Sequence, residues 1–487
     1  MSDSPVATPA DEVPVYDFVV IGGGSAGYAA ARTAADLGLK TALVEGGRDI
    51  GGLCILRGCM PSKTMIESAN RFVTLRRAQE FGLRAENIRV VPEEVQARKR
   101  RLVGEFADYR RGQIEHGKFA FIRGLARFID AHHLEILPPE NPDDVRPVPH
   151  RIEARTILVA TGSHVADVPI PGLPETGYIT SDEALELEAY PDSITILGAG
   201  AIGLEAAHQF AGLGTQVTVI QRCGQIMRGT DADVAGALQL GLSNQGIRFQ
   251  CSTNLLRADL DPSNGDKRVW FERGGSEHCV ASREILFALG RRPCTRGLEL
   301  HLAGVEQTKT GGIKVTPDQR STARHIFAAG DVCGPYEIVH IAIQQAELAA
   351  RNAARLLGKL GTSPEHIDYR LKLFVLFTDP QMAHVGLSES EAREAGREFE
   401  TATYAFADHG KAMVRGETDG LVKLMADRAT GEILGASAVG PESGEIIHEL
   451  VVAMHYHATA ADLAAIPHYH PTLSEIWTYP AEELAAR

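Results

Sequence analysis

VYDFVVIGGGSAGYAAARTAADLGLKTALVE, residues 15–45, is the stretch that decides the architecture of the chain. A β-branched run at 16–21 leads into a G-x-G-x-x-G turn and an Ala-rich helical segment, and a second apolar run ends at Glu45. This order of strand, tight turn, helix and strand is typical of a dinucleotide-binding βαβ unit. The glycines let backbone N–H groups approach a pyrophosphate at the helix N-terminus, and the acidic residue can bind a ribose hydroxyl. The three motif glycines are Gly22, Gly24 and Gly27.

A second unit of the same design occupies residues 193–222, SITILGAGAIGLEAAHQFAGLGTQVTVIQR. We expect strands at 194–197 and 216–220, with a Gly-rich turn and a helix between them. Two such units predict two bound nucleotides. The natural chemistry for two is electron transfer between a nicotinamide and a second redox cofactor, most often a flavin. The motif glycines of this unit are Gly198, Gly200 and Gly203.

The two units differ at the position of the acidic residue. The first ends in Glu45, which suits an unphosphorylated ribose, whereas the second ends in Arg222, with Arg228 six residues later. An Arg at this position can pair with a 2′-phosphate, so the second unit favours NADP(H), with NAD(H) as the alternative.

Length and composition exclude several classes of protein. A chain of 487 residues predicts about three domains. The formal net charge of -14, without a basic stripe, argues against nucleic acid as a partner. No apolar stretch approaches the roughly 20 residues of a membrane-spanning helix. The polar, acidic start, residues 1–14, lacks the features of a cleaved export signal, so we expect a flexible tail on a cytoplasmic protein.

Cys54 and Cys59 stand five residues apart in GGLCILRGCMPSK, residues 51–63, whereas the other five cysteines are scattered singly. Seven cysteines in 487 residues do not make a disulfide scaffold, and in a reducing compartment a disulfide is usually catalytic or redox-sensing. A zinc site is poorly supported, because no second Cys or His pair follows at ligand spacing, so we predict no metal. The spacing alone leaves structural thiols and a reactive pair equally open.

Eight motifs, taken in order, resemble the class I pyridine nucleotide–disulfide oxidoreductases, the family of dihydrolipoyl dehydrogenase, glutathione reductase and mercuric reductase. The resemblance covers almost everything after the N-terminal tail. The motifs are GGGSAG (22–27), GGLCILRGCMPSK (51–63), ATGS (160–163), GAGAIGLE (198–205), GRRP (290–293), AAGDVCG (328–334), FTDP (377–380) and HYHPTLSE (468–475).

The resemblance implies an FAD site, a nicotinamide site and a fold. Residues expected at the cofactors are Gly22, Gly24, Gly27, Glu45, Gly52, Thr161, Gly162 and Asp331 for FAD, Gly198, Gly200, Gly203, Arg222 and Arg228 for the nicotinamide nucleotide, and Arg291 in GRRP. Lys63 would approach the flavin and pair with Glu205, because a buried charge needs a partner. The fold class is α/β, with two Rossmann-like domains and a C-terminal α+β dimerisation domain.

The same resemblance assigns chemistry to the cysteines. An ideal helix would hold the two Cα atoms roughly 8 to 9 Å apart, beyond the reach of a disulfide, so a bridged pair requires a distorted segment. Gly58 and Pro61 would permit that distortion. In the family the first cysteine, here Cys54, exchanges with substrate, and Cys59 faces the flavin.

A base is also implied, because the thiolate is the nucleophile in thiol–disulfide exchange. His470 matches the acid–base histidine of the family and Glu475 the carboxylate that orients it. In the family these two residues come from the partner subunit, which implies a homodimer with shared active sites.

The substrate is narrowed by exclusion. His470 and the absence of a cysteine pair near residue 487 argue against a mercuric reductase or a large thioredoxin reductase, and Arg32 stands too late after the first glycine motif to be counted on for glutathione. SAGYAAARTAADLG and HPTLSE are most similar to dihydrolipoyl dehydrogenase, which favours a lipoyl-type dithiol.

Departures from the family pattern keep other substrates open. Leu56 and Arg57 lie between the cysteines, where Asn and a small apolar residue are usual, and Cys294 follows GRRP. An NADPH-linked enzyme for glutathione, another disulfide or a metal ion is one alternative. A flavin transhydrogenase, a quinone reductase or a redox-sensing flavoprotein subunit is another.

The expected domains are a tail (1–14), an FAD domain (15–189), a nicotinamide domain (190–289), a central segment that completes the FAD domain (290–368) and an interface domain (369–487).

Overall fold

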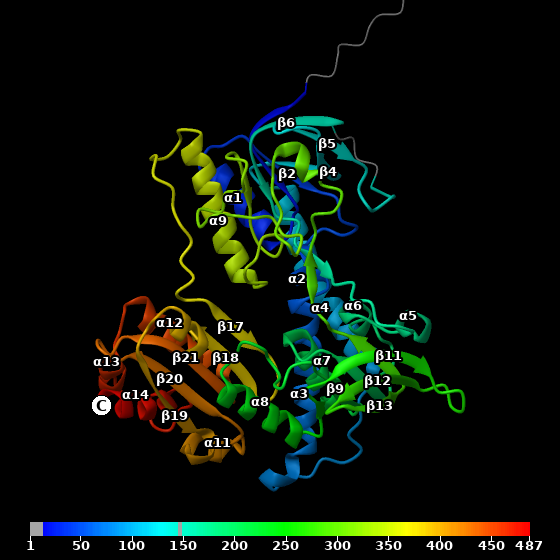
Figure 1. Cartoon of the computed structure of the whole chain (residues 1–487), viewed down its shortest axis with the longest axis vertical. Coiled ribbons are helices and arrows are strands. Elements are labelled where there is room, and N and C mark those ends of the chain that lie inside the picture. Colours follow the sequence, from blue (N-terminus) through cyan, green and yellow to red (C-terminus); the bar gives the residue numbers. More distant parts are fainter. Residues whose placement is uncertain (1–12, 145–148) are drawn as a thin grey trace, which may run out of the picture. The chain divides into compact units, whose positions relative to one another are not determined.

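The computed structural model describes residues 13–144 and 149–487, so the predicted tail lies outside the described residues except for Val13 and Pro14. The chain forms two compact units (Figure 1). The first unit contains residues up to Gly58, 103–164 and 291–367, and the second contains 59–102, 165–290 and 368–487. No helix in the described ranges combines the length and the apolar character needed to cross a membrane.

The first unit is built on a seven-stranded sheet. Parallel strands run in the order β3-β2-β1-β6, β16 pairs with the end of β6, and β4 and β5 add to the sheet in antiparallel fashion beside β6. The predicted βαβ unit is present, because helix α1 joins two neighbouring parallel strands. The elements are β1 (Val15–Ile21), α1 (Ser25–Asp36), β2 (Thr41–Glu45), β3 (Ala120–Arg123), β4 (Leu125–Phe128), β5 (His133–Leu137), β6 (Arg151–Val159) and β16 (Ile326–Ala328).

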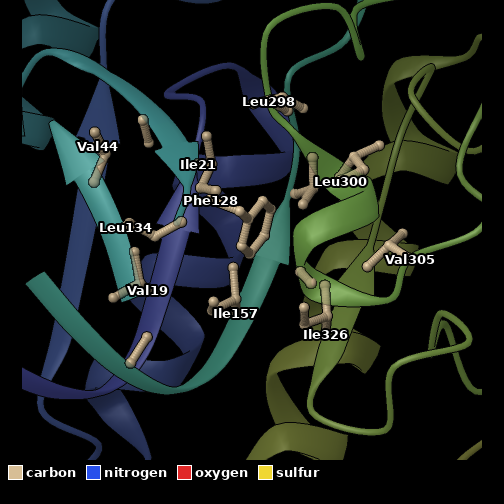
Figure 2. Packing of buried hydrophobic residues seen from close by; sticks show 14 of the residues in the cluster. Val19, Ile21, Val44, Phe128, Leu134, Ile157, Leu298, Leu300, Val305 and Ile326 are labelled. Atoms are coloured by element: carbon tan, nitrogen blue, oxygen red, sulfur yellow. The ribbon is translucent and has the colours of Figure 1, made fainter. Parts of the chain in front are cut away.

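Alternate residues of β1 enter two different cores, as the period of a strand requires. Phe18 and Val20 pack with the alanines of α1 and of α9 (Val339–Leu356), two helices that contact each other closely. Val19 and Ile21 face the opposite way. Figure 2 shows them packed with Phe128 of β4 and with Leu300, which lies on the short 3-10 helix η2 (Leu300–Ala303).

Backbone contact at the glycine motif brings α1 close to β1. Gly22 has a φ of +104°, in the region that favours glycine. A Cβ atom on Gly27 would lie 1.8 Å from the carbonyl oxygen of Gly22, so no side chain fits there. Gly203 and Gly198 repeat this arrangement in the second unit, where the corresponding distance is 2.1 Å.

The second unit contains the other nucleotide-binding fold. Its four parallel strands run in the order β10-β9-β8-β14. One face of this sheet packs on α7 and α8, and the other packs on the antiparallel sheet β11-β12-β13. The elements are β8 (Ser193–Leu197), α7 (Ala201–Gly212), β9 (Gln216–Ile220), α8 (Ala232–Asn244), β10 (Arg248–Gln250), β11 (Asn254–Leu260), β12 (Lys267–Arg273), β13 (Ser276–Ser282) and β14 (Glu284–Phe287).

The C-terminal part of the second unit is a five-stranded antiparallel sheet with the order β17-β18-β21-β20-β19. Helices α12 and α14 pack on it around the buried Trp477. The predicted fold class is therefore confirmed. The elements are β17 (Leu373–Leu376), β18 (Gln381–Gly386), α10 (Glu389–Glu394), β19 (Phe399–Ala405), η3 (Phe406–Asp408), α11 (Gly410–Arg415), β20 (Leu421–Asp427), β21 (Ile433–Gly440), α12 (Ser443–His455), α13 (Ala460–Ala465), η4 (Ser474–Trp477) and α14 (Thr478–Ala485).

The other elements connect these sheets. They are α2 (Gly52–Leu56), α3 (Cys59–Arg76), η1 (Ala78–Phe81), α4 (Pro92–Glu115), β7 (Ser163–Val165), α5 (Leu173–Thr176), α6 (Ser181–Ala184), β15 (Arg291–Pro293) and η2 (Leu300–Ala303).

The compact units divide the chain differently from the predicted domains. Residues 59–102 and 165–189, which we assigned to the FAD domain, group with the nicotinamide domain, because α3 packs on α7 and α5 on β11. Other unit limits, at 290/291 and 367/368, fall close to predicted boundaries. The boundaries of the functional domains stay a prediction.

We expect Gly27→Ala to lower the free energy of unfolding by about 3 kcal/mol, because the new methyl group overlaps a backbone oxygen that cannot move without breaking the turn. Thermal unfolding and the FAD content of the purified protein measure the effect. Gly104→Ala is the matched control, because Gly104 lies within α4 and a Cβ atom there meets nothing within 4 Å. The free energy of unfolding of Gly104→Ala should rise by about 0.5–1 kcal/mol, because Ala has a higher helix propensity than Gly. Equal stability of the two variants would contradict the close-contact explanation.

Candidate active site

At the start of α1, the backbones of Gly24 and Gly52 lie in close contact. Gly24 precedes the helix, and no side chain caps the first N–H groups there. Gly52, at the start of α2, has a φ of +76°, and a Cβ atom on it would lie 2.5 Å from the Cα atom of Gly24. Uncapped N–H groups beside bare backbone form a cradle that suits a pyrophosphate. The turn therefore fits the predicted dinucleotide.

Glu45 lies at the end of β2 and is held by backbone donors. The N–H groups of Gly23 and Gly47 each donate to its carboxylate at 2.6 Å. These bonds fix both oxygens at the turn, and each oxygen keeps a lone pair for a further donor. A ribose hydroxyl of FAD would be such a donor.

A hydrogen-bonded chain joins the ATGS and GRRP motifs to Asp331. The hydroxyl of Ser163 donates to Asp331 Oδ2 at 2.6 Å. Arg291 donates to the hydroxyl and to the carbonyl oxygen of Ser163, both at 2.7 Å. Arg291 thus orients Ser163 and Asp331. We did not predict a separate role for Ser163, although it lies in a quoted motif.

Thr161 and Gly162 are tied to Cys294. The Thr161 hydroxyl donates to the carbonyl oxygen of Cys294 at 2.6 Å, and the N–H of Cys294 donates to Gly162 at 2.9 Å. Cys294 Sγ lies 3.4 Å from Nδ1 of His164, but burial raises the pKa of its thiol. Its backbone therefore supports the predicted FAD segment, and its thiol is a weak nucleophile at neutral pH.

The segment with the two cysteines is broken between them, as a bridged pair would require. Helix α2 ends at Leu56, Arg57 has non-helical φ and ψ angles of -142° and 16°, and α3 begins at Cys59. A Cβ atom on Gly58 would lie 2.9 Å from the carbonyl oxygen of Leu53, so glycine allows the chain to turn tightly. Cys54 and Cys59 are both half-buried. The disulfide itself stays a prediction.

Arg110, on α4, is a cation of the first unit that we did not foresee. Its guanidinium lies 4.3 Å from the centre of the Tyr28 ring and interacts electrostatically with Cys54. A positive charge near a thiol favours the thiolate. No local pattern in the sequence links α4 to Cys54.

Lys63 and Glu205 form an ion pair between α3 and α7. Lys63 Nζ lies 2.7 Å from Oε2 and 3.0 Å from Oε1 of Glu205, whose side chain is 11% exposed. Phe377, in the FTDP motif, donates its N–H to the same carboxylate at 3.2 Å, and its ring lies 4.9 Å from Lys63 Nζ. The pair is thus held by three segments that are distant in the sequence.

His208 fixes the two helices that carry this ion pair. Its ring is buried on α7, with Nε2 2.6 Å from Asn70 Oδ1 on α3 and Nδ1 3.2 Å from Gln245 Oε1. Burial lowers the pKa of His208 from its ordinary value of 6.5 to about 4. His208 is therefore neutral at pH 7.

The second glycine motif has the same features as the first. Gly200 precedes α7 without a side-chain cap, and a Cβ atom on Gly200 would meet nothing within 4 Å. Arg222 and Arg228 follow β9, and both are exposed. Within the described part of the chain neither Arg pairs with a carboxylate, so both cations are available to a phosphate.

His470 and Glu475 lie together in the C-terminal domain. Nδ1 of His470 is 3.0 Å from both carboxylate oxygens of Glu475. The His470 side chain is 77% exposed, whereas that of Glu475 is 9% exposed. A buried carboxylate therefore orients an exposed imidazole with its Nε2 atom free to exchange a proton. His468 bonds separately to Glu449.

Comparison with known proteins identifies the family. The model of the pyridine nucleotide-disulphide oxidoreductases matches residues 16–346, and the model of their dimerisation domain matches 374–481. The chain belongs to this family. It is an FAD-dependent oxidoreductase that uses NAD(P)H, as the resemblance implied.

Relatives of this oxidoreductase differ in substrate. It is 33% identical to dihydrolipoyl dehydrogenase of Bacillus subtilis (strain 168), covering 91% of this chain and 92% of the relative. It is 32% identical to mercuric reductase of Bacillus cereus, covering 92% of this chain and 68% of the relative. A solved structure described as the Cu(II) complex of HOCl-induced flavoprotein disulfide reductase RclA from Escherichia coli is 27% identical in sequence, with a TM-score of 0.82. The match covers 97% of this chain and 100% of the solved chain.

The dimerisation domain of the oxidoreductase exposes large apolar side chains. Four of them lie on α12 and in the segments that lead to His470, and they are Val452, Tyr456, Ile466 and Tyr469. Exposed aromatic and aliphatic groups of this kind are typical of an interface. Together with the family match they support a homodimer.

A cluster of acidic groups in the oxidoreductase is neutralised from within. The carboxylates of Asp231, Asp233 and Glu389 converge, and Lys423 Nζ lies 3.1, 2.9 and 2.5 Å from them. The ammonium group occupies the position that a metal ion would take. This cluster is an ion-pair network.

We expect His208→Gln to weaken the pH dependence of stability. Between pH 4 and 6.5 the unfolded chain binds a proton that the buried ring does not, so the contribution of His208 is complete above pH 6.5 and is lost as the pH falls toward 4. Between pH 7 and pH 5 this loss is about 2 kcal/mol.

Urea unfolding at pH 5, 6 and 7 measures the effect. The free energy of unfolding should fall less in the variant than in the wild type over that range. His448→Gln, at an exposed position on α12, is the control and should behave as the wild type. A variant curve parallel to the wild-type curve would show that His208 is not buried neutral.

Proposed function

We propose that this oxidoreductase passes electrons between a nicotinamide nucleotide and a dithiol or disulfide substrate through Cys54 and Cys59, and that a lipoyl-type dithiol is the substrate. The observation that carries the proposal is the contact between His470 and Glu475, because an oriented, exposed imidazole is what thiol–disulfide exchange needs. Transhydrogenase or quinone chemistry at a flavin needs neither this pair nor the cysteines.

The exchange consists of two displacements at sulfur. His470 accepts the proton of the substrate thiol, and the resulting thiolate attacks Cys54, which breaks the Cys54–Cys59 bond and releases Cys59 as a thiolate. The second substrate thiol then displaces Cys54 and passes its proton to the departing Cys54 sulfur. The substrate leaves as a disulfide, Cys54 is then a thiol and Cys59 a thiolate, and His470 holds the other proton. Arg110 interacts electrostatically with Cys54, and its positive charge would stabilise negative charge that develops on this sulfur during the exchange.

Bound FAD supplies the two-electron relay between the cysteine pair and the nicotinamide. Its predicted contacts are the cradle of Gly22, Gly24, Gly27 and Gly52, with Glu45, Thr161, Gly162 and Asp331. Arg291 would act by orienting Ser163 and Asp331. Lys63 would bring its charge to the flavin and Glu205 would hold that charge in place.

The exposure of His470 favours a shared active site. The ring projects from the dimerisation domain, close in sequence to the apolar Ile466 and Tyr469. We infer that it serves the cysteines of the partner subunit, as the family resemblance implies. Each subunit would then supply its His470 to the cysteines of its partner, and its own cysteines would be served by His470 of the partner subunit.

Arg222 and Arg228 favour NADP(H) over NAD(H). Exposed cations without a carboxylate partner in the described ranges suit a 2′-phosphate, whereas an acidic residue would repel it.

Other substrates within the family are the main alternatives. Leu56 and Arg57 differ from the usual residues between the cysteines, and relatives include a mercuric reductase and a neighbour described with Cu(II). A glutathione-type disulfide or a metal ion would therefore be the next candidate substrate.

A reducing, cytoplasmic environment suits the seven cysteines of the chain.

We expect a long-wavelength charge-transfer band when FAD-loaded protein is reduced anaerobically with NADPH, NADH or dihydrolipoamide, because the Cys59 thiolate would lie against the flavin. Absorption spectra recorded after each reductant measure the band. Cys59→Ser should abolish it, and Cys279→Ser, at an exposed cysteine of β13, should keep it.

The relative rates identify the substrate. Rapid reduction by dihydrolipoamide supports the lipoyl-type assignment. Rapid reduction by NADPH without any band would contradict the role of the cysteine pair and favour a transhydrogenase.

We expect Arg222→Ala combined with Arg228→Ala to raise the KM for NADPH by about 10- to 100-fold, because charge-assisted hydrogen bonds to a phosphate are lost. The KM for NADH should stay within about twofold, since NADH has no 2′-phosphate. Steady-state kinetics with both nucleotides measure this. Arg248→Ala, at an exposed position of neighbouring β10, is the control. Equal changes for the two nucleotides would show that these residues do not read the phosphate.

A further inference from the structure

A second histidine, His409, lies on the far side of the proposed acid–base pair from solvent. It stands between η3 and α11, where its N–H donates to the carbonyl oxygen of Phe406 at 3.1 Å. Its side chain is fully buried, in contrast to the exposed ring of His470. The backbone at this corner therefore directs an imidazole into the interior of the dimerisation domain.

Two aromatic rings lie edge-on to the His409 ring. The ring centres of Phe406 and Tyr479 lie 6.3 Å from it, both edge-on, and Tyr479 stacks on Tyr404 at 4.0 Å. These groups fix the orientation of the imidazole but offer it no strong acceptor.

Glu475 is the polar group that His409 faces. Nε2 of His409 lies 3.4 Å from Oε1 of Glu475, longer than the usual length of a hydrogen bond. In the described part of the chain neither ring nitrogen of His409 has a hydrogen-bond partner. Buried polar groups are nearly always satisfied, so two open nitrogens beside a carboxylate call for a functional explanation.

The charge states follow from the surroundings. Burial lowers the pKa of His409, although Glu475 acts in the opposite direction and His470 in the same one. Tyr479 and Tyr404 are the other titratable groups near the ring, and burial raises the pKa of Tyr404. A neutral His409 can offer one N–H to Glu475 without neutralising its negative charge.

We propose that His409 is a positioning residue for the acid–base pair, holding the Glu475 carboxylate from the interior while the carboxylate orients His470 at the surface. The inference rests on the proposed role of His470 and Glu475. The buried imidazole, 3.4 Å from one oxygen of Glu475, would restrain the carboxylate and so keep the Nδ1–H of His470 aligned, which leaves Nε2 directed at the substrate thiol. His409 touches neither substrate nor cofactor and acts through Glu475.

Nothing in the local sequence marks this residue. Sixty-six positions separate His409 from Glu475, and DHGK at 408–411 carries no motif that we recognised. The three groups meet only because η4, which carries Glu475, and the corner before α11 pack against the same sheet.

The test is the half-reaction with dihydrolipoamide, followed by stopped-flow absorbance from pH 5.5 to 9. His409→Phe keeps an aromatic ring and removes the donor. We expect its kcat to fall about tenfold with little change in KM, since general acid–base catalysis is impaired and the substrate contacts are intact. The apparent pKa of the pH profile should rise, because a carboxylate without its inner donor attracts the His470 proton more strongly.

Three further variants make the test specific. His409→Gln places an amide N–H near the former Nε2 position and should recover part of kcat. The double variant with Glu475→Gln should be no slower than Glu475→Gln alone, because a residue that acts through Glu475 has no effect without it. His384→Phe, at a histidine of β18 bonded to Ser437, is the control and should leave the pH profile unchanged.

The outcomes separate the two proposals. An unchanged pH profile in His409→Phe, or a lower melting temperature alone, together with a slow Glu475→Gln enzyme, would overturn the role of His409 and leave the proposed function intact. A Glu475→Gln enzyme as fast as the wild type would overturn the acid–base pair itself. Flavin reduction by NADPH, which does not use His470, should be the same in all the variants.

Discussion

Direct backbone contact at the two glycine turns is the constraint on which the rest of the molecule depends. Gly27 lies on the carbonyl oxygen of Gly22 and Gly203 on that of Gly198, so α1 and α7 start against their strands with no side chain between. Each helix then presents uncapped N–H groups at a fixed place. These two helix starts also position other groups. Gly52 contacts the backbone of the first turn at Gly24, and Glu205 lies on the helix that begins at the second turn.

Half-buried and buried carboxylates form the next level of organisation. Glu45 is held by two backbone N–H groups, Asp331 by a serine that an arginine orients, and Glu205 by a lysine and a backbone N–H. Charge-assisted hydrogen bonds of this kind are strong and directional. The family match shows an oxidoreductase that uses FAD and NAD(P)H, and we propose that these three carboxylates serve its cofactor sites. Glu475 is the fourth, and its partners are two histidines of opposite exposure.

Sequence patterns predicted the fold well because the pattern and the physical cause coincide. A strand, three glycines and an alanine-rich helix can pack closely in few ways, so residues 15–45 and 193–222 formed the expected units. The break between Cys54 and Cys59 followed from helix geometry together with the bridged pair that the family resemblance implies.

Contacts between distant segments were harder to predict. Ser163, Phe377, Arg110 and His409 each act on a group more than fifty residues away, and an isolated Arg, His or Phe has no local pattern that would reveal its partner. The grouping of 165–189 with the nicotinamide domain likewise depends on packing of α5 against β11, which composition does not encode.

The turn at Gly58 separates chemistry from recognition. Because α2 ends at Leu56 and α3 starts anew at Cys59, the side chains at 56 and 57 stand outside the hydrogen-bond ladder of α3. These two residues can therefore differ without disturbing the helix that carries Lys63. A substitution at 56 or 57 would then leave the proposed electron relay unchanged while altering the surroundings of the two sulfur atoms, which suits a family whose members include a dihydrolipoyl dehydrogenase and a mercuric reductase.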